Sequence, residues 1–528
     1  MKQKINRKNQ HLFLSKTQIA VIIVLIFLVF SLINLNKYGE TTDEHFSVYR
    51  GLIAFAYLEE FFFEHDSGIF HLTRNSGGVL EHPTFYPMLL VTSSTIFQER
   101  FGLNYIESYH LLNLLVFTLG LIFLFKLVSE MFSKKIGVYA LIFMTLFPRF
   151  IAHAHFNSKD VPLMSFLIIS MYFAYHAVKY KSLKSTFFAG LLFAISVSTK
   201  LDALNLILVF LFSWILFVLL TKQYKDKKVL KKHFLMLLVF AASFLIFVYA
   251  FWVLLWKNPF WIFKSIGFFL GDFINVAVLF FGKIHGSNHM VWYYYPVYIF
   301  LVTPILTFLF FLTGIFTSFK KKFLKAKLFE IILLSGWLFI PLLVRVIFNV
   351  NSYNGIRHIF FIIPSLIIFS ALGFNFFLYF IKNKFFKYSK KIFYVVFALL
   401  VFWLVLESLM IHPHQGSYFN EPTRLLTPGD LGENFHLDYW GQSYIFGVEW
   451  LNNNVDEMSR VCLLTFSNLF KNYDLSPKIV RSCNNPDYLM LLTAYEGNYD
   501  YVNLSEYDLE YAVSVYDSDL SRIYKRKR

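Results

Sequence analysis

The sequence has only two cysteines among its 528 residues and no glycine-rich loop of the kind that cradles a nucleotide phosphate. Two cysteines cannot form a metal site alone, and without such a loop we expect no nucleotide-sugar site. Hydrophobic residues instead make up 57% of the chain, phenylalanine alone numbers 67, and the mean hydropathy is +0.54. This apolar share exceeds that of ordinary soluble domains. The composition predicts a polytopic membrane protein.

Apolar runs long enough to cross a bilayer recur along the chain. The first, at 17–35, follows a basic N-terminal segment that should stay in the cytoplasm. It lacks a small-residue cleavage site, so we expect an uncleaved anchor. The later runs are 108–128, 136–150, 161–179, 184–199, 203–221, 234–256, 292–317, 328–348, 358–380 and 392–411. Rich in phenylalanine, leucine and isoleucine and poor in charge, they predict about eleven transmembrane helices and not barrel strands.

The formal net charge of +16 is unevenly distributed. Lysines concentrate in the connectors 222–232, 320–327 and 382–391, which is the pattern of the positive-inside rule and not of a nucleic-acid-binding surface. Placing these connectors in the cytoplasm gives an alternating path with the N-terminus inside and the C-terminus outside. We therefore expect an integral membrane protein of a bacterial inner membrane or an endoplasmic reticulum membrane, with no nucleic-acid partner.

The character of the chain changes after residue 411. Short alternating runs at 460–465, 488–493 and 511–516 predict strands, and 443–452 predicts a helix. The expected organisation is a membrane module over 1–411 and a small extracytoplasmic α/β domain over 412–528. Both cysteines, Cys462 and Cys483, fall in this domain and could pair in an oxidising compartment.

The connectors on the outer face gather ionisable residues at helix ends, a pattern that indicates a functional site. The first, 36–107, also contains amphipathic stretches at 51–63 and 83–97 that predict helices lying in the membrane interface. Carboxylates can act as general bases toward a hydroxyl, and basic side chains can stabilise a phosphate leaving group. The carboxylates are Asp43, Glu44 and Asp160, and the candidates for binding the phosphate are His82, Arg149, Lys159, Lys200, Arg357 and His358.

Several local motifs carry a resemblance to a known family. They are Asp43-Glu44, Glu81-His82-Pro83, Pro148-Arg149-Phe150, Asn157 to Pro162, Ser198-Thr199-Lys200, Trp292 to Pro296, Tyr353 to His358, His412 to Gln415, Tyr418-Phe419-Asn420 and Leu437 to Gly441. In order and placement, over about 15–455, the chain resembles the GT-C glycosyltransferases, in particular protein O-mannosyltransferases and the bacterial transferases that move aminoarabinose or other sugars from polyprenyl phosphate.

The resemblance implies roles for four residues. Asp43 would be the base that deprotonates the acceptor hydroxyl, and Glu44 would orient the acceptor or assist Asp43. Arg149 would meet the lipid phosphate, and Asp160 would supply the carboxylate of the second outer loop. The implied reaction transfers a sugar from a polyprenyl phosphate to an acceptor hydroxyl with inversion of the anomeric configuration.

One departure concerns the first outer loop, where aminoarabinose-type enzymes have a lysine two residues after the loop glutamate but Glu81 is followed by His82 and Pro83. This speaks against an aminoarabinose donor. Some relatives hold a metal between such a glutamate and a later histidine, which would make Glu81 with His285 or His289 weak candidates for a divalent metal site.

Other readings remain open. The acceptor can be a protein hydroxyl, lipid A or another surface glycan. A lipid or solute transporter would also carry many helices and intramembrane charges. A non-catalytic scaffold is a third alternative.

Overall fold

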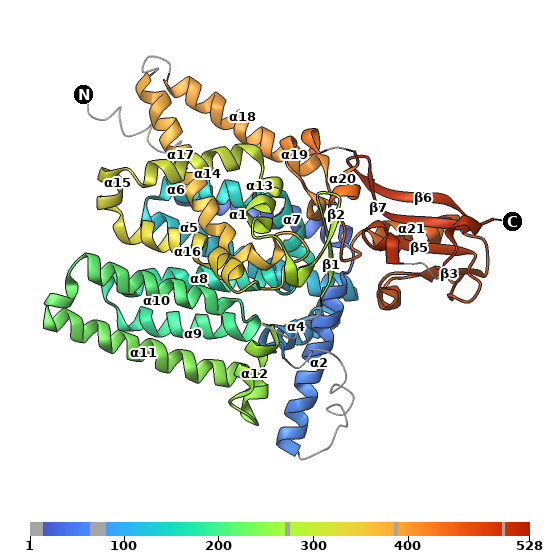
Figure 1. Cartoon of the computed structure of the whole chain (residues 1–528), viewed down its shortest axis with the longest axis horizontal. Coiled ribbons are helices and arrows are strands. Elements are labelled where there is room, and N and C mark those ends of the chain that lie inside the picture. Colours follow the sequence, from blue (N-terminus) through green and yellow to red (C-terminus); the bar gives the residue numbers. More distant parts are fainter. Residues whose placement is uncertain are drawn as a thin grey trace, which may run out of the picture.

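Long apolar helices lie side by side as a bundle, and a small sheet domain covers one end of it (Figure 1). The computed structural model describes residues 14–63, 81–269, 275–384, 389–427, 429–498 and 502–527. The polytopic helical fold with a C-terminal sheet domain is the one that the sequence predicted.

In the described part, seven helices are long and apolar enough to cross a membrane, or eight if one bent pair is counted as a span. The seven are α1 Lys16–Ile33, α5 Tyr105–Met131, α8 Asp160–Tyr180, α10 Ala203–Leu220, α11 Lys227–Phe251, α16 Leu328–Ile347 and the unit of η7 Arg357–Ile362 with α17 Ile363–Lys384. Three shorter apolar helices complete the bundle: α9 Leu183–Thr199, α14 Ile305–Ser318 and 394–410 within α18 Ser389–Met410.

Two of the predicted runs are divided at a proline. The run 136–150 is divided between α6 Lys134–Thr145 and α7 Pro148–Phe156, which meet at 70°. The run 292–317 is divided between α13 Tyr294–Val302 and α14, which begins directly after Pro304. Proline lacks a backbone N–H and disfavours helical geometry in the residue before it, so each break falls at a proline.

Glycine allows the closest helix contact in the bundle. A Cβ at Gly314 of α14 would lie 1.8 Å from the carbonyl oxygen of Phe369 in α17, and a Cβ at Gly373 would lie 1.9 Å from that of Phe310. Any side chain at either position would force the helices apart. The α14–α17 crossing thus follows the small-residue packing of membrane helices.

Two further helices lie within the first connector, where the sequence predicted helices. They are α2 Thr42–Phe63 and α4 Phe85–Phe101, and they pack on each other. In Figure 1, α2 runs across the direction of α9, α10 and α11, at the end of the bundle that faces the sheet domain. The helix begins earlier than expected, so Asp43 and Glu44 lie in its first turn and not in a loop. Residues 64–80 of the predicted connector lie outside the described residues.

The C-terminal domain contains a five-stranded sheet in the order β4-β3-β5-β7-β6, in which β3 is parallel to β4 and β5, and β7 is antiparallel to β5 and β6. Its elements are α21 Tyr444–Asn454, β3 Ser459–Leu463, β4 Ile479–Arg481, β5 Tyr488–Leu492, β6 Tyr507–Val515 and β7 Ser518–Arg526. The helix and three of the strands coincide with predicted ones. The polar β7 and the three-residue β4 were not predicted. Cys462 and Cys483 form a disulfide, the pairing that the sequence left open.

The sheet domain holds the segment that precedes α2. The Asn472 side-chain amide donates to both carboxylate oxygens of Glu40, at 2.9 and 2.8 Å, and the backbone N–H of Thr42 donates to the carbonyl of Trp440 at 3.1 Å. These contacts fix where α2 begins and therefore where Asp43 lies.

Candidate functional site

Asp43 lies between two basic side chains that come from distant parts of the chain. Its Oδ1 is 3.1 Å from Lys159 Nζ, and its Oδ2 is 2.5 Å from Arg357 Nη1. Lys159 precedes α8, and Arg357 begins η7. A carboxylate and two cations thus meet where three helices begin.

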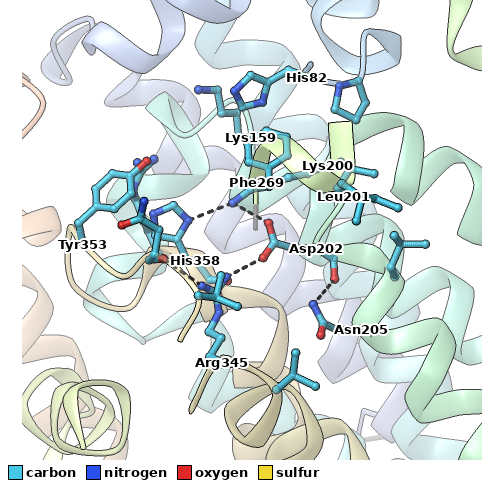
Figure 2. Close-up of a pocket in the computed structure, with 17 residues that line it drawn as sticks. His82, Lys159, Lys200, Leu201, Asp202, Asn205, Phe269, Arg345, Tyr353 and His358 are labelled. Atoms are coloured by element: carbon cyan, nitrogen blue, oxygen red, sulfur yellow. Dashed lines mark hydrogen bonds and ion pairs between the residues drawn. The ribbon is translucent and has the colours of Figure 1, made fainter. Parts of the chain in front are cut away.

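The ion pairs continue into a network through Asp160, which begins α8. Asp160 Oδ1 is 2.6 Å from Lys200 Nζ at the end of α9, and Lys200 is also 3.3 Å from Asp202. Asp202 is in turn 2.6 Å from Arg345 Nη2 in α16, as Figure 2 shows. With Asp43 and Arg357, the network joins α2, α8, α16, η7 and the segment between α9 and α10.

Local structure fixes the central residues of this network. Asn157 Oδ1 accepts from the backbone N–H groups of Lys159 at 3.2 Å and Asp160 at 2.8 Å, a local turn of the kind that asparagine favours. The guanidinium of Arg357 lies over the rings of Tyr353 and Trp440, at 4.9 and 4.8 Å from their centroids. Such cation–π contacts orient a guanidinium while leaving its N–H groups available.

A cavity of about 220 Å³ adjoins the network. Its wall combines polar side chains, four of which belong to lysine or arginine, with apolar ones (Figure 2). The polar lining consists of His82, Lys159, Lys200, Asp202, Asn205, Arg345, Asn351, Tyr353, Arg357 and His358, and the apolar lining consists of Pro83, Leu201, Leu204, Ile266, Phe269, Val344 and Val350. The cavity therefore suits an amphiphilic molecule with an anionic head.

The charges at Asp43 and Lys159 are strongly perturbed. Burial alone would raise the pKa of Asp43, but the positive charges of Lys159 and Arg357 outweigh it and hold that pKa well below its usual range. Burial and repulsion from Arg50 lower the pKa of Lys159 to about 7, although Asp43 partly opposes the change. The Asp43 carboxylate is therefore ionised at neutral pH, whereas Lys159 is close to losing its proton.

The structure brings together most of the residues that the sequence nominated. Asp43 and Asp160 belong to the ion-pair network, and His82, Lys159, Lys200, Arg357 and His358 line the cavity. Lys200 Nζ is also 3.4 Å from His358 Nδ1. These contacts place the residues without testing their roles.

Glu44 and Arg149 lie apart from this cavity lining. Buried Glu44 accepts from the backbone N–H and the hydroxyl of Thr41 and pairs with His110 at 3.2 Å, the contacts of a helix-capping residue. Arg149 is 1% exposed and donates through Nε to the carbonyl of Tyr418 at 3.1 Å. Asp43 and Glu44 are adjacent in sequence, yet only Asp43 contacts the cationic cluster.

The residues suggested for a metal do not converge on a site. Glu81 forms an ion pair with Lys264 at 3.2 Å, His285 lies in β2 Lys283–Gly286, and His289 ends the short helix η6. Within the described ranges, no group of three or more histidine, cysteine or acidic side chains is arranged to hold a metal ion. Glu81, His285 and His289 therefore do not fit a metal site.

Sequence reasoning missed three charged residues of the cluster: Arg50, Asp202 and Arg345. Arg345 lies inside a predicted span, where an ionisable side chain is itself a functional signal. Asp202 follows Lys200 by two residues, next to a motif already singled out. Arg50 lies seven residues after Asp43, which places it on the same side of α2 two turns further along.

The fold is that of a polytopic helical membrane protein with a charged cluster at one end of its helix bundle. A family model described as dolichyl-phosphate-mannose-protein mannosyltransferase matches residues 81–253. The match covers about a third of the chain, and the fold is of the GT-C type that the motifs predicted.

Solved structures resemble this chain at low sequence identity. ArnT from Cupriavidus metallidurans in the apo state is similar over 96% of this chain and 98% of its own, with 14% identity and a TM-score of 0.51. The same protein bound to undecaprenyl phosphate is similar over 96% of this chain and 97% of its own, with 12% identity and a TM-score of 0.49. The apo oligosaccharyltransferase from Archaeoglobus fulgidus has 14% sequence identity over 89% of this chain and 61% of its own, with a TM-score of 0.46. No curated protein sequence matches the chain.

Proposed function

We propose that this protein transfers a sugar from a polyprenyl-phosphate carrier to an acceptor hydroxyl at the outer face of the membrane. One observation carries the proposal: the Asp43 carboxylate lies 3.1 Å from Lys159 and 2.5 Å from Arg357, and both cations line a half-apolar cavity. A base for the acceptor and cations for the leaving phosphate thus occupy one site.

The balance of charge supports a phosphate leaving group. The cluster contains five cationic residues and three carboxylates, which leaves an excess of two positive charges when all are ionised. The cations are Arg50, Lys159, Lys200, Arg345 and Arg357, and the carboxylates are Asp43, Asp160 and Asp202. A sugar–phosphodiester carries one negative charge, and the phosphomonoester that leaves carries nearly two. The cluster therefore matches the product side of the reaction better than the donor, which favours bond cleavage.

The apolar wall supports a lipid-linked donor. Side chains such as Ile266, Phe269 and Val344 give the cavity an apolar lining beside its charged groups. The matched family is described by a dolichyl-phosphate-linked mannose, which is a polyprenyl-type carrier. Mannose on a polyprenyl phosphate is accordingly the first donor to test.

The transfer proceeds as a single displacement. The acceptor oxygen forms a bond to the anomeric carbon while its proton passes to a carboxylate oxygen of Asp43. The bond from the anomeric carbon to the phosphate oxygen breaks, and the electron pair leaves with the phosphate toward Lys159 and Arg357. Attack from the side opposite the phosphate inverts the anomeric configuration. The acceptor hydroxyl belongs to a protein, as in O-mannosylation, or to lipid A or another surface glycan.

A transfer assay tests the function. Purified protein, polyprenyl-phosphate mannose labelled in the sugar, and an acceptor membrane extract should yield labelled acceptor and free polyprenyl phosphate in equal amounts. Arg357→Gln should lose both products. Movement of intact donor across a proteoliposome membrane without release of lipid phosphate would instead identify a transporter and refute the proposal.

The orientation of the site needs its own test. We expect the C-terminal domain to lie outside the cytoplasm, because the lysine-rich connectors mark the opposite face. A reporter that is active only outside the cytoplasm, fused after Asn452, should be active. Activity from a cytoplasmic reporter alone would place the site on the wrong face for this reaction.

A further inference from the structure

Arg50 is a buried arginine that contacts no counter-charge among the described residues. It lies in α2, and the residue is only 8% exposed. Its Nε and Nη1 atoms are buried and make no hydrogen bond to any described residue. Among the residues that the structure describes, none forms a hydrogen bond or ion pair with it. Burying an unpaired guanidinium is costly, so such a group is retained where a ligand supplies the missing charge.

The other four cations of the cluster each contact a carboxylate. Lys159 and Arg357 pair with Asp43, Lys200 pairs with Asp160, and Arg345 pairs with Asp202. Within the described part of the cluster, Arg50 is therefore the cation that keeps its full capacity to bind an anion.

The charge of Arg50 affects two residues that line the cavity. After burial, its charge is the largest cause that lowers the pKa of His82 and the largest that lowers the pKa of Lys159. Both residues line the cavity, and they come from different elements. Contacts of α2 agree with this position: Ser47, one turn before Arg50, has its hydroxyl 2.9 Å from that of Ser158, next to Lys159. The Arg50 side chain therefore lies near the part of the cavity wall that Lys159 forms.

We propose that Arg50 is a phosphate-binding residue, and that an oxygen of a phosphate ester bridges Arg50 and Lys159 when the lipid donor is bound. The proposal rests on the function proposed above and assigns it a further residue. A bidentate guanidinium–phosphate contact satisfies the unpaired N–H groups of Arg50. It also removes the repulsion between Arg50 and Lys159.

This binding mode couples the donor to the base. A phosphate that draws Lys159 toward itself weakens the contact between Lys159 and Asp43. The Asp43 carboxylate then loses part of its compensating charge and accepts a proton more readily. Asp43 would thus be a weak base in the empty site and a stronger one once the donor is in place.

Binding of undecaprenyl phosphate in detergent tests the proposal without requiring turnover. We expect Arg50→Met to weaken this binding at least tenfold, and Arg50→Lys to fall between Arg50→Met and the unaltered protein. Arg100→Met is the matched control, because Arg100 is exposed on α4, and it should bind normally. Inorganic phosphate, as a second probe, measures the head-group contribution alone and should show the same order of variants.

Thermal unfolding of the ligand-free variants separates binding from a structural role. Removing an unpaired buried charge should leave the melting temperature of Arg50→Met unchanged or raise it. A lower melting temperature with unchanged lipid-phosphate affinity would make Arg50 a structural residue and overturn the inference. If Arg50→Met and Arg50→Lys both bind undecaprenyl phosphate with unchanged affinity, the role of Arg50 is refuted but the proposed function is not. If the unaltered protein fails to bind undecaprenyl phosphate, the proposed function is refuted as well.

Discussion

Replacement of Asp43 by asparagine should lower turnover but tighten donor binding. The amide keeps the size of the side chain but cannot take the acceptor proton, so turnover should fall about 10²–10⁴-fold. The same change removes a negative charge that lies 3.1 Å from Lys159 and 2.5 Å from Arg357. Both cations then become available to the donor phosphate, so we expect donor binding to become tighter.

The size of this gain follows from the electrostatics of the site. At an effective dielectric constant of about 20, a phosphate charge about 5–6 Å from the Asp43 carboxylate is repelled by roughly 3 kcal/mol. Solvent and rearrangement of the ion pairs reduce this value, and half of it still corresponds to about a tenfold gain in affinity. We therefore predict at least tenfold tighter binding of the lipid donor together with the loss of turnover.

The assay measures transfer rate and donor affinity for the same purified preparations. Glu59→Gln is the matched control, because it neutralises an exposed carboxylate on the same helix and should change neither quantity. Turnover of Asp43→Asn within about threefold of this control would remove Asp43 as the base. Weaker donor binding by Asp43→Asn would refute the competition between the carboxylate and the phosphate.

Three further outcomes are expected. Glu44→Ala should destabilise the protein by about 1–3 kcal/mol, because it leaves the buried His110 side chain and the backbone N–H of Thr41 without their partner. Activity per folded molecule should stay within a few-fold, and normal thermal unfolding with lost activity would contradict this. Donor affinity should fall as pH rises above about 7, because the pKa of Lys159 is lowered to about 7 and the anionic donor binds the charged form of this lysine. Lys159→Arg should instead bind the donor independently of pH between 6 and 9, and pH-independent donor binding by the unaltered protein would refute the assignment. Cys462→Ser should cost about 2–4 kcal/mol of unfolding free energy, and thiol labelling of the unreduced, unfolded protein should find neither Cys462 nor Cys483 free.

Local sequence determined the membrane character and the position of most helices. A run such as 203–221 can satisfy its backbone only as a helix once it enters lipid, so length and hydropathy suffice to predict α10. The same reasoning predicted α2 and α4 from their amphipathic patterns, and the motifs nominated Asp43, Asp160, Lys159, Lys200 and Arg357. Hydropathy alone could not predict the breaks at Pro148 and Pro304, because each break lies within a continuous apolar run.

Only the tertiary structure decided which charges meet. Asp43 and Arg357 are 314 residues apart in sequence, and Asp202 and Arg345 are 143 apart, so no local pattern relates them. Asp43 and Glu44 are neighbours of the same chemical type, but successive helical residues point in different directions, about 100° apart. One carboxylate therefore meets the cations, while the other caps the helix. An ion-pair network depends on the directions in which side chains leave several packed helices, and those directions are fixed by the whole fold.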